Sequence, residues 1–152
     1  MNQAIILAAG EGSRMKSSLI KVLHKINGKA MLKYVLDATE RAGFDKRYLI
    51  VGNNKDKVIE EFSSDKSIEF IEQKMGPGEP YGTGYAASLA KDHIKTDDNV
   101  LVIFGDTPLV DEEILKDFLK FHKDNDNNMT ILSAILDNCD GYGRILRDKD
   151  NN

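Results

Sequence analysis

The chain has 152 residues, of which 41% are hydrophobic and 30% are charged. That length suits one domain with a single core, and that composition excludes wholesale disorder. The formal net charge is −4, which disfavours a nucleic-acid binding protein because such proteins usually need a basic face.

Apolar runs and helical periodicity alternate along the chain. The sequence predicts strands at residues 3–8, 47–52, 67–72 and 99–106, and helices at residues 31–43, 55–62, 83–94 and 111–122. Gly43 is expected to cap the first of these helices, and the Thr83 hydroxyl the third. Two further strands are predicted at residues 129–136 and 143–148. This alternation predicts an α/β domain of the Rossmann-like kind, with a mostly parallel sheet and helices on both faces.

The ends of the predicted strands locate the candidate ligand site. Ligands of parallel sheets bind beyond the carboxyl ends of the strands. The loops after Ala8 and Phe104 are therefore expected on the same rim. The last predicted strand stops in a turn, which would leave the kind of unpaired edge that proteins avoid. We therefore expect the chain to be truncated at its C-terminus and to belong to a longer protein.

The sequence has neither a membrane-spanning run nor a pair of cysteines, and both facts bear on where in the cell the protein is found. The longest apolar run, residues 4–9, is too short to span a membrane. Cys139 is the only cysteine, so no internal disulfide can form. We therefore expect a cytoplasmic protein without a membrane partner.

The loop after the first strand carries an unusual combination of residues. Gly10 and Gly12 allow backbone amides to face an anion, while Arg14 and Lys21 supply cations that suit phosphate oxygens. Together they favour a nucleoside triphosphate. The segment is neither a Walker A loop nor a dinucleotide fingerprint, since Met15 stands at the third glycine position. The alternative is an ordinary surface loop with scattered cations.

Two later segments complete the candidate site. Asp106, just past a buried strand, could hold Mg²⁺ through one oxygen while substrate phosphates fill other positions. Its alternative role is to cap the turn that contains Pro108. The small residues of YGTGYA, residues 81–86, would let a flat base approach the backbone. The alternative is that these residues only form a flexible loop tip.

These segments resemble the bacterial N-acetylglucosamine-1-phosphate uridyltransferases, whose nucleotidyltransferase domain is half of a bifunctional enzyme. LAAGEGSRMKSSLIKVLH is similar to the opening signature of that family, and NGKAMLKYVLD to the segment that follows it. GTGYA, GDTPLV and GYGRI resemble three later motifs in the same order, so the resemblance spans residues 7–145. The presence of both KVLH and GDTPL distinguishes this family from related thymidylyl- and guanylyltransferases.

The resemblance implies a role for each matching position. Arg14 and Lys21 would be the catalytic cations, Asp106 would hold Mg²⁺, and Gly143 would meet the sugar phosphate. Nucleotide binding would fall to the opening segment and to the region before and within the third helix, namely Leu7, Ala8, Ala9, Gly10, Gly12, Ser13, Gln73, Gly82 and Thr83.

Four departures from the family pattern stand out. Ser13 replaces threonine, Ile20 replaces proline and Tyr85 replaces histidine. Residues 74–81 form a longer stretch than the family usually has between Gln73 and the glycine of GTGYA.

The implied activity is the synthesis of UDP-N-acetylglucosamine and pyrophosphate from UTP and N-acetylglucosamine 1-phosphate, with Mg²⁺ as cofactor. Residues 1–152 would be the nucleotide-binding part of the domain, with the sugar-binding remainder and any homo-oligomer contacts in the missing C-terminal part. Two alternatives stay open: a nucleotidyltransferase for another sugar phosphate, and a nucleotide-binding paralogue without activity.

Overall fold

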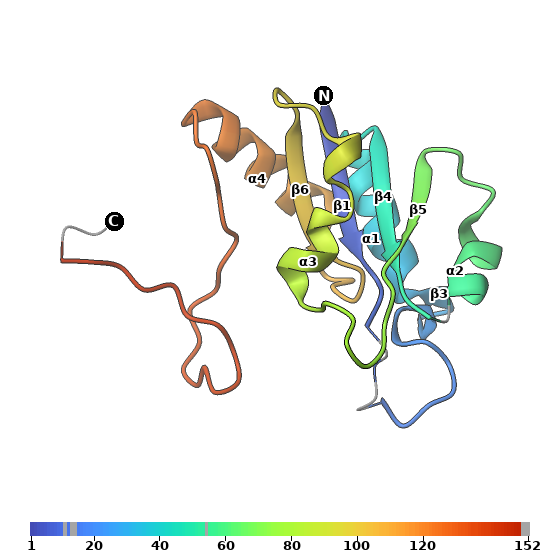
Figure 1. Cartoon of the computed structure of the whole chain (residues 1–152). Helices are drawn as coiled ribbons and strands as arrows, with labels where there is room; N and C mark the ends of the chain where they lie inside the picture. Colours follow the sequence, from blue (N-terminus) through green and yellow to red (C-terminus); the bar gives the residue numbers. More distant parts are fainter. Residues whose placement is uncertain (11, 13–14, 54, 150–152) are drawn as a thin grey trace.

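A computed structural model describes residues 1–10, 12, 15–53 and 55–149 (Figure 1). Its centre is a four-stranded parallel sheet in the order β5-β4-β1-β6. The strands are β1 (Asn2–Leu7), β4 (Lys46–Val51), β5 (Ile68–Glu72) and β6 (Asn99–Phe104). All four were predicted from the sequence to within two residues, and the parallel α/β class is confirmed.

Each predicted helix is present, although one is shorter than expected. The helices are α1 (Met31–Arg41), α2 (Lys55–Phe62), α3 (Thr83–Ser88) and α4 (Glu112–Asp124). The predicted helix 83–94 ends early, and a single 3-10 turn, η3 (Lys91–His93), follows it. The expected Thr83 cap is wrong. Gly82, with φ 105°, occupies the N-cap position and no side-chain hydrogen bond caps the helix.

Helices cover both faces of the sheet, as predicted. On one face, Ile6 and Leu49 pack with the buried side chains of α1, α2 and α4. On the other face, Ile5 and Ile50 pack against Ala86 of α3. Successive residues of a strand point to opposite faces, so neighbours in β1 and β4 belong to different cores. The two layers fix the strands between them and leave their carboxyl ends open to loops.

The chain reverses direction across the sheet beside β1. From β1 it proceeds outward through β4 to β5, and it then crosses back to place β6 on the other side of β1. In the register of the sheet, Ile6 is therefore paired with Leu49 of β4 on one side and with Ile103 of β6 on the other. Ligands of open parallel sheets bind at such a reversal point, beyond the carboxyl ends of the strands. Here the reversal point lies between β1 and β6.

A small hairpin escaped the sequence-based prediction. β2 (Lys25–Ile26) and β3 (Lys29–Ala30) pair antiparallel across Asn27 and Gly28, both of which have positive φ. The Asn-Gly dipeptide is the usual signal for this turn and could have revealed the hairpin. The hairpin leads directly into α1.

The two strands predicted near the C-terminus are wrong. Residues 129–136 and 143–148 have neither strand nor helix structure, and Figure 1 shows this segment leaving the domain after α4. Apolar side chains such as Ile131, Ile135 and Leu146 are 58%, 103% and 86% exposed. A strand forms only when its backbone groups find a partner, and the described part of the chain offers them none.

No helix in the described ranges has the length and apolar character that crossing a membrane requires.

Candidate functional site

The loops after β1 and β6 touch at the reversal point of the sheet. Gly105 N donates a hydrogen bond of 2.8 Å to the Leu7 carbonyl oxygen, and Ala8 N donates one of 2.9 Å to Ile50 O. The loop after β1 is therefore attached to the ends of both neighbouring strands. The expectation that the segments after Ala8 and Phe104 share one rim is confirmed.

Glycines at two strand ends allow this close approach. A Cβ atom at Gly52 would lie 2.7 Å from the Ala9 carbonyl oxygen. A Cβ atom at Gly105 would lie 3.3 Å from the Leu7 carbonyl oxygen and 3.1 Å from Leu32 Cδ1. Neither contact was foreseen, but a glycine directly after a buried strand was the available signal.

Lys21 begins a short 3-10 helix, η2 (Lys21–Leu23), whose next two side chains are buried. Gly12 packs against the stem of this lysine, because a Cβ on Gly12 would lie 2.6 Å from Lys21 Cβ. Gly12 also has φ +63°, a conformation that favours glycine. Ile20 has φ −57°, within the range that proline imposes, so a proline at this position would be compatible with this φ.

The Lys21 ammonium forms an ion pair with the Asp106 carboxylate. The two residues are 85 positions apart in sequence, and the fold brings them together where the β1 and β6 loops meet. Both side chains are partly accessible, with exposed fractions of 34% for Lys21 and 28% for Asp106. The predicted phosphate-binding cation and the predicted metal ligand therefore share one site.

The residues predicted to read the base lie along the same rim. Gln73 directly follows β5 and is 4% exposed, and its backbone N–H donates to Val51 O at 2.8 Å. Gly82 and Thr83 are exposed at the start of α3, which contacts β1. The stretch 74–81 forms an exposed loop between them and Gln73.

Two predicted site residues fall outside the described part of the chain, and one described residue lies away from this rim. Ser13 and Arg14 lie outside the described residues. Gly143 is exposed in the segment that follows α4, away from the sheet. The other predicted residues (Leu7, Ala8, Ala9, Gly10, Gly12, Lys21, Gln73, Gly82, Thr83 and Asp106) lie in the strand ends and loops of the carboxyl rim.

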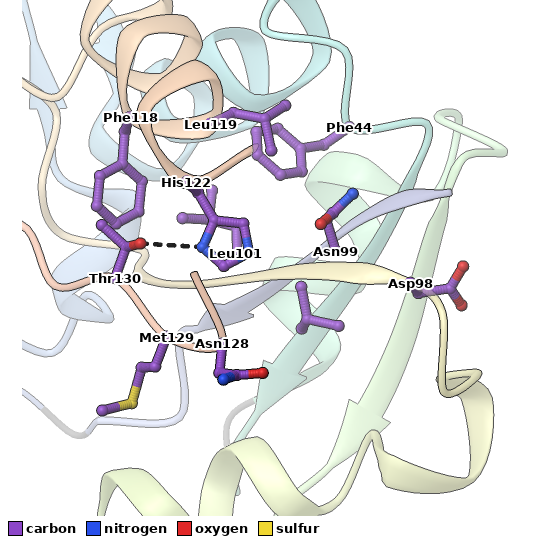
Figure 2. Close-up of a pocket in the computed structure, with 11 residues that line it drawn as sticks. Phe44, Asp98, Asn99, Leu101, Phe118, Leu119, His122, Asn128, Met129 and Thr130 are labelled. Carbon is purple, nitrogen blue, oxygen red and sulfur yellow. Dashed lines mark hydrogen bonds between the residues drawn. The ribbon is translucent and has the colours of Figure 1, made fainter. Parts of the chain in front are cut away.

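A separate cavity of about 230 Å³ lies at the amino end of the sheet (Figure 2). Phe44, Phe118 and Leu119 supply its apolar wall, and His122 Nδ1 lies 2.9 Å from Thr130 Oγ1 at its edge. None of the predicted site residues lines it. By contrast, the space between Ala8 and the end of β4 is only about 20 Å³.

A family model for the MobA-like NTP transferase domain matches residues 4–135. The bifunctional protein GlmU of Clostridioides difficile (strain 630) is 40% identical over 147 residues, which cover 97% of this chain and 31% of GlmU. The chain thus spans about a third of the length of the curated relatives it matches. This similarity confirms the resemblance found in the motifs.

Solved structures show the same fold. HddC from Yersinia pseudotuberculosis superposes with a TM-score of 0.64 at 28% identity, covering 82% of this chain and 55% of HddC. Rv0371c from Mycobacterium tuberculosis, in a complex with manganese, gives a TM-score of 0.60 at 18% identity, covering 78% of this chain and 57% of that one. HddC has also been solved with GMP-PN.

Proposed function

The chain belongs to the family of MobA-like NTP transferase domains, and on that premise we propose that it provides the nucleotide-binding half of a sugar-1-phosphate uridyltransferase site. The reaction would join UTP to N-acetylglucosamine 1-phosphate and release pyrophosphate. The observation that carries the proposal is the meeting of Lys21 and Asp106 beside the loop after β1. The motif resemblance to the uridyltransferases supports the choice of UTP and of this sugar.

The chemistry requires positioning and charge stabilisation rather than a protein nucleophile. An oxygen of the sugar phosphate attacks the α-phosphorus of UTP, and the bond to the departing pyrophosphate breaks on the opposite side. Lys21 would offset the negative charge that develops at the α-phosphate, with Arg14 and the loop amides on the other phosphates. Gly12 and Gly52 support this arrangement by letting the loop lie close to Lys21 and to the end of β4.

The residues present fit a divalent cation, which we propose to be Mg²⁺. Asp106 already has a cation against its carboxylate, the Lys21 ammonium. No group of three Asp, Glu, His or Cys side chains suited to a metal occurs in the part of the chain that the structure describes. One carboxylate completed by substrate phosphates is a common magnesium arrangement. When bound there, the ion would neutralise phosphate charge and favour release of pyrophosphate. The manganese complex of Rv0371c supports a divalent ion.

The base and the sugar would be bound by different parts of the protein. Gln73 would read the uracil edge together with Gly82 and Thr83. The sugar phosphate would require Gly143 and chain beyond these 152 residues, since the relatives are about three times longer. We therefore expect this chain alone to bind UTP but to catalyse the transfer slowly. We propose that it does so in the cytoplasm.

A different nucleotide is the second candidate. The complex of HddC with GMP-PN shows that a relative of similar fold takes a guanine nucleotide. A glutamine amide both donates and accepts, so Gln73 alone does not discriminate between the two bases.

A nucleotide panel tests the proposal. The melting temperature of the 152-residue chain is measured with Mg²⁺ and each of UTP, CTP, GTP, ATP and dTTP, because a ligand of the native state raises it. Pyrophosphate release is then measured in the complete protein with each sugar 1-phosphate. We expect the largest shift with UTP and the fastest release with N-acetylglucosamine 1-phosphate. A preference for GTP would support the second candidate, and no shift with any nucleotide would contradict both.

A further inference from the structure

The ion pair between Lys21 and Asp106 joins two groups that the proposed function assigns to different ligands. Lys21 is expected on a phosphate and Asp106 on a metal ion, but in this structure the lysine ammonium lies against Oδ2 of the carboxylate, where it would compete with a cation. The inference below rests on that proposed function. It concerns what the pair does before the ligands arrive.

The backbones that carry the two groups are fixed. Leu23 N donates to Ile20 O at 3.0 Å, which closes the turn that holds Lys21, and Gly12 lies against the lysine stem. Asp106 follows Gly105, which is hydrogen-bonded to the end of β1. The mobile element is therefore the lysine chain beyond its Cβ. Its ammonium can move without any change in the fold.

The two charged ends have no other partner among the residues that the structure describes. Within the ranges that the structure describes, the only hydrogen bond of the Lys21 ammonium is to Asp106, and that carboxylate accepts only from Lys21. Ion pairs with this much exposure are weak, because water screens the attraction and the lysine chain loses freedom. A triphosphate, with several negative charges, is a stronger partner for the ammonium than one carboxylate.

We propose that Lys21 is a placeholder for the divalent cation in the nucleotide-free protein. Its ammonium occupies the face of the Asp106 carboxylate that the metal ion would take. An arriving triphosphate draws the ammonium away and so frees the carboxylate for the ion. Nucleotide and metal therefore bind with positive coupling, and free metal binds weakly without nucleotide.

Metal binding without nucleotide is the direct test. Free Mn²⁺ is titrated into the 152-residue chain and followed by electron paramagnetic resonance, for the wild type, Lys21→Met, Asp106→Asn and the double variant. We expect Lys21→Met to bind Mn²⁺ roughly tenfold more tightly than the wild type, since a neighbouring positive charge is removed. The gain should vanish in the double variant, because it acts through Asp106.

Lys55→Met is the matched control. Lys55 follows β4 on the same rim and forms an ion pair with Glu72, and its side chain is 34% exposed, as that of Lys21 is. If the gain came from lowering the overall positive charge of the rim, this variant would show it too. We expect its Mn²⁺ affinity to stay within twofold of the wild type. An equal gain in Lys55→Met, or a gain that survives in the double variant, would overturn the proposal.

The reverse coupling gives a second measurement. UTP binding is measured by calorimetry in EDTA, so that no metal takes part. Asp106→Asn should bind UTP several-fold more tightly than the wild type, because Lys21 is released. Against a Lys21→Met background the same change should give a markedly smaller gain, since only the repulsion between carboxylate and phosphate is then relieved. Equal gains in the two backgrounds would overturn the proposal.

Failure of this inference differs from failure of the proposed function. If UTP does not bind with or without Mg²⁺, the nucleotide site itself is wrong. If UTP binds and Mn²⁺ binding requires Asp106, but Lys21→Met leaves nucleotide-free Mn²⁺ binding unchanged, only the placeholder role is excluded.

Discussion

Two ion pairs at opposite ends of the sheet are built in different ways. At the amino end, Arg47 is 1% exposed and donates at 2.9 Å both to Asp65 and to the Leu36 carbonyl oxygen. At the carboxyl end, Lys21 and Asp106 have only each other among the described residues, and both are partly accessible. A buried charge with several partners is fixed, whereas a single accessible contact can be exchanged for a ligand.

Empty volume does not separate the two ends of the sheet, because a cavity of about 640 Å³ runs along β6 to Phe104 and is also lined by Thr83. The amino end has the cavity of about 230 Å³ shown in Figure 2, and the space beside Ala8 at the carboxyl end is about 20 Å³. In this chain strand direction and charge locate the candidate site better than volume does. Substitutions at each end test the contrast between the two ion pairs.

The first prediction removes the carboxyl-end pair. Lys21→Ala and Asp106→Ala should each lower turnover of the complete protein roughly a hundredfold to a thousandfold, the usual loss for a group that stabilises transition-state charge. Pyrophosphate release with UTP and the sugar 1-phosphate measures it. Lys120→Ala is the control, because Lys120 pairs with Asp124 on the exposed side of α4. Turnover of this control should stay within twofold of the wild type; an equal loss would remove the contrast between the two ends.

The second prediction removes the amino-end charge. Arg47→Met should lower the free energy of unfolding by about 3 kcal/mol, because Asp65 loses its ion-pair partner and the Leu36 carbonyl oxygen loses one of its donors. Urea denaturation measures it, and the UTP affinity of the folded protein should be unchanged. Lys46→Met is the matched control on the same strand, since its 3.2 Å pair with Glu69 is exposed, and it should cost less than about 1 kcal/mol. A large change in UTP affinity with Arg47→Met would show that the amino end takes part in binding.

The third prediction concerns two glycines of one loop. Gly12→Ala should lower the free energy of unfolding by about 1–2 kcal/mol, because Gly12 has φ +63° and its new Cβ would press on the Lys21 stem. Gly10→Ala should change it by less than about 0.5 kcal/mol, since no atom lies within 4 Å of a Cβ at that position. Urea denaturation separates the two, and calorimetry should show weaker UTP binding for Gly12→Ala. Equal stability losses would contradict the close contact with Lys21.

The sequence was informative wherever local pattern and strand order act together. Apolar runs predict the four strands, and the rule for parallel sheets predicts Asp106 beside the opening loop. The pairing of Lys21 with Asp106 could not be predicted, because it depends on the side-chain geometry of residues 85 positions apart. The apolar residues 129–136 were misassigned for a related reason, since a strand pattern becomes a strand only beside a partner.

The last prediction uses acid to probe the fixed pair. Partial burial raises the pKa of Asp65, but hydrogen bonds from Ser67 and the charge of Arg47 outweigh it and hold that pKa below the usual 3.8. A carboxyl whose pKa is lower in the folded state stabilises the fold above its unfolded pKa, and this contribution is lost as the pH falls through the folded pKa. Stability should therefore decline below about pH 4.

Asp65→Asn isolates that contribution. The variant should be less stable than the wild type at pH 6 by about 1 kcal/mol, and the gap should narrow as the pH is lowered to 3, because protonation removes the same charge from the wild type. Urea denaturation at each pH measures it. Asp124→Asn removes an exposed pair on α4, and the difference between its free energy of unfolding and that of the wild type should stay constant across this pH range. If the gap for Asp65→Asn stayed constant from pH 6 to 3, the charge of Asp65 would not be what stabilises the amino end, and the two ion pairs would differ less than their geometry indicates.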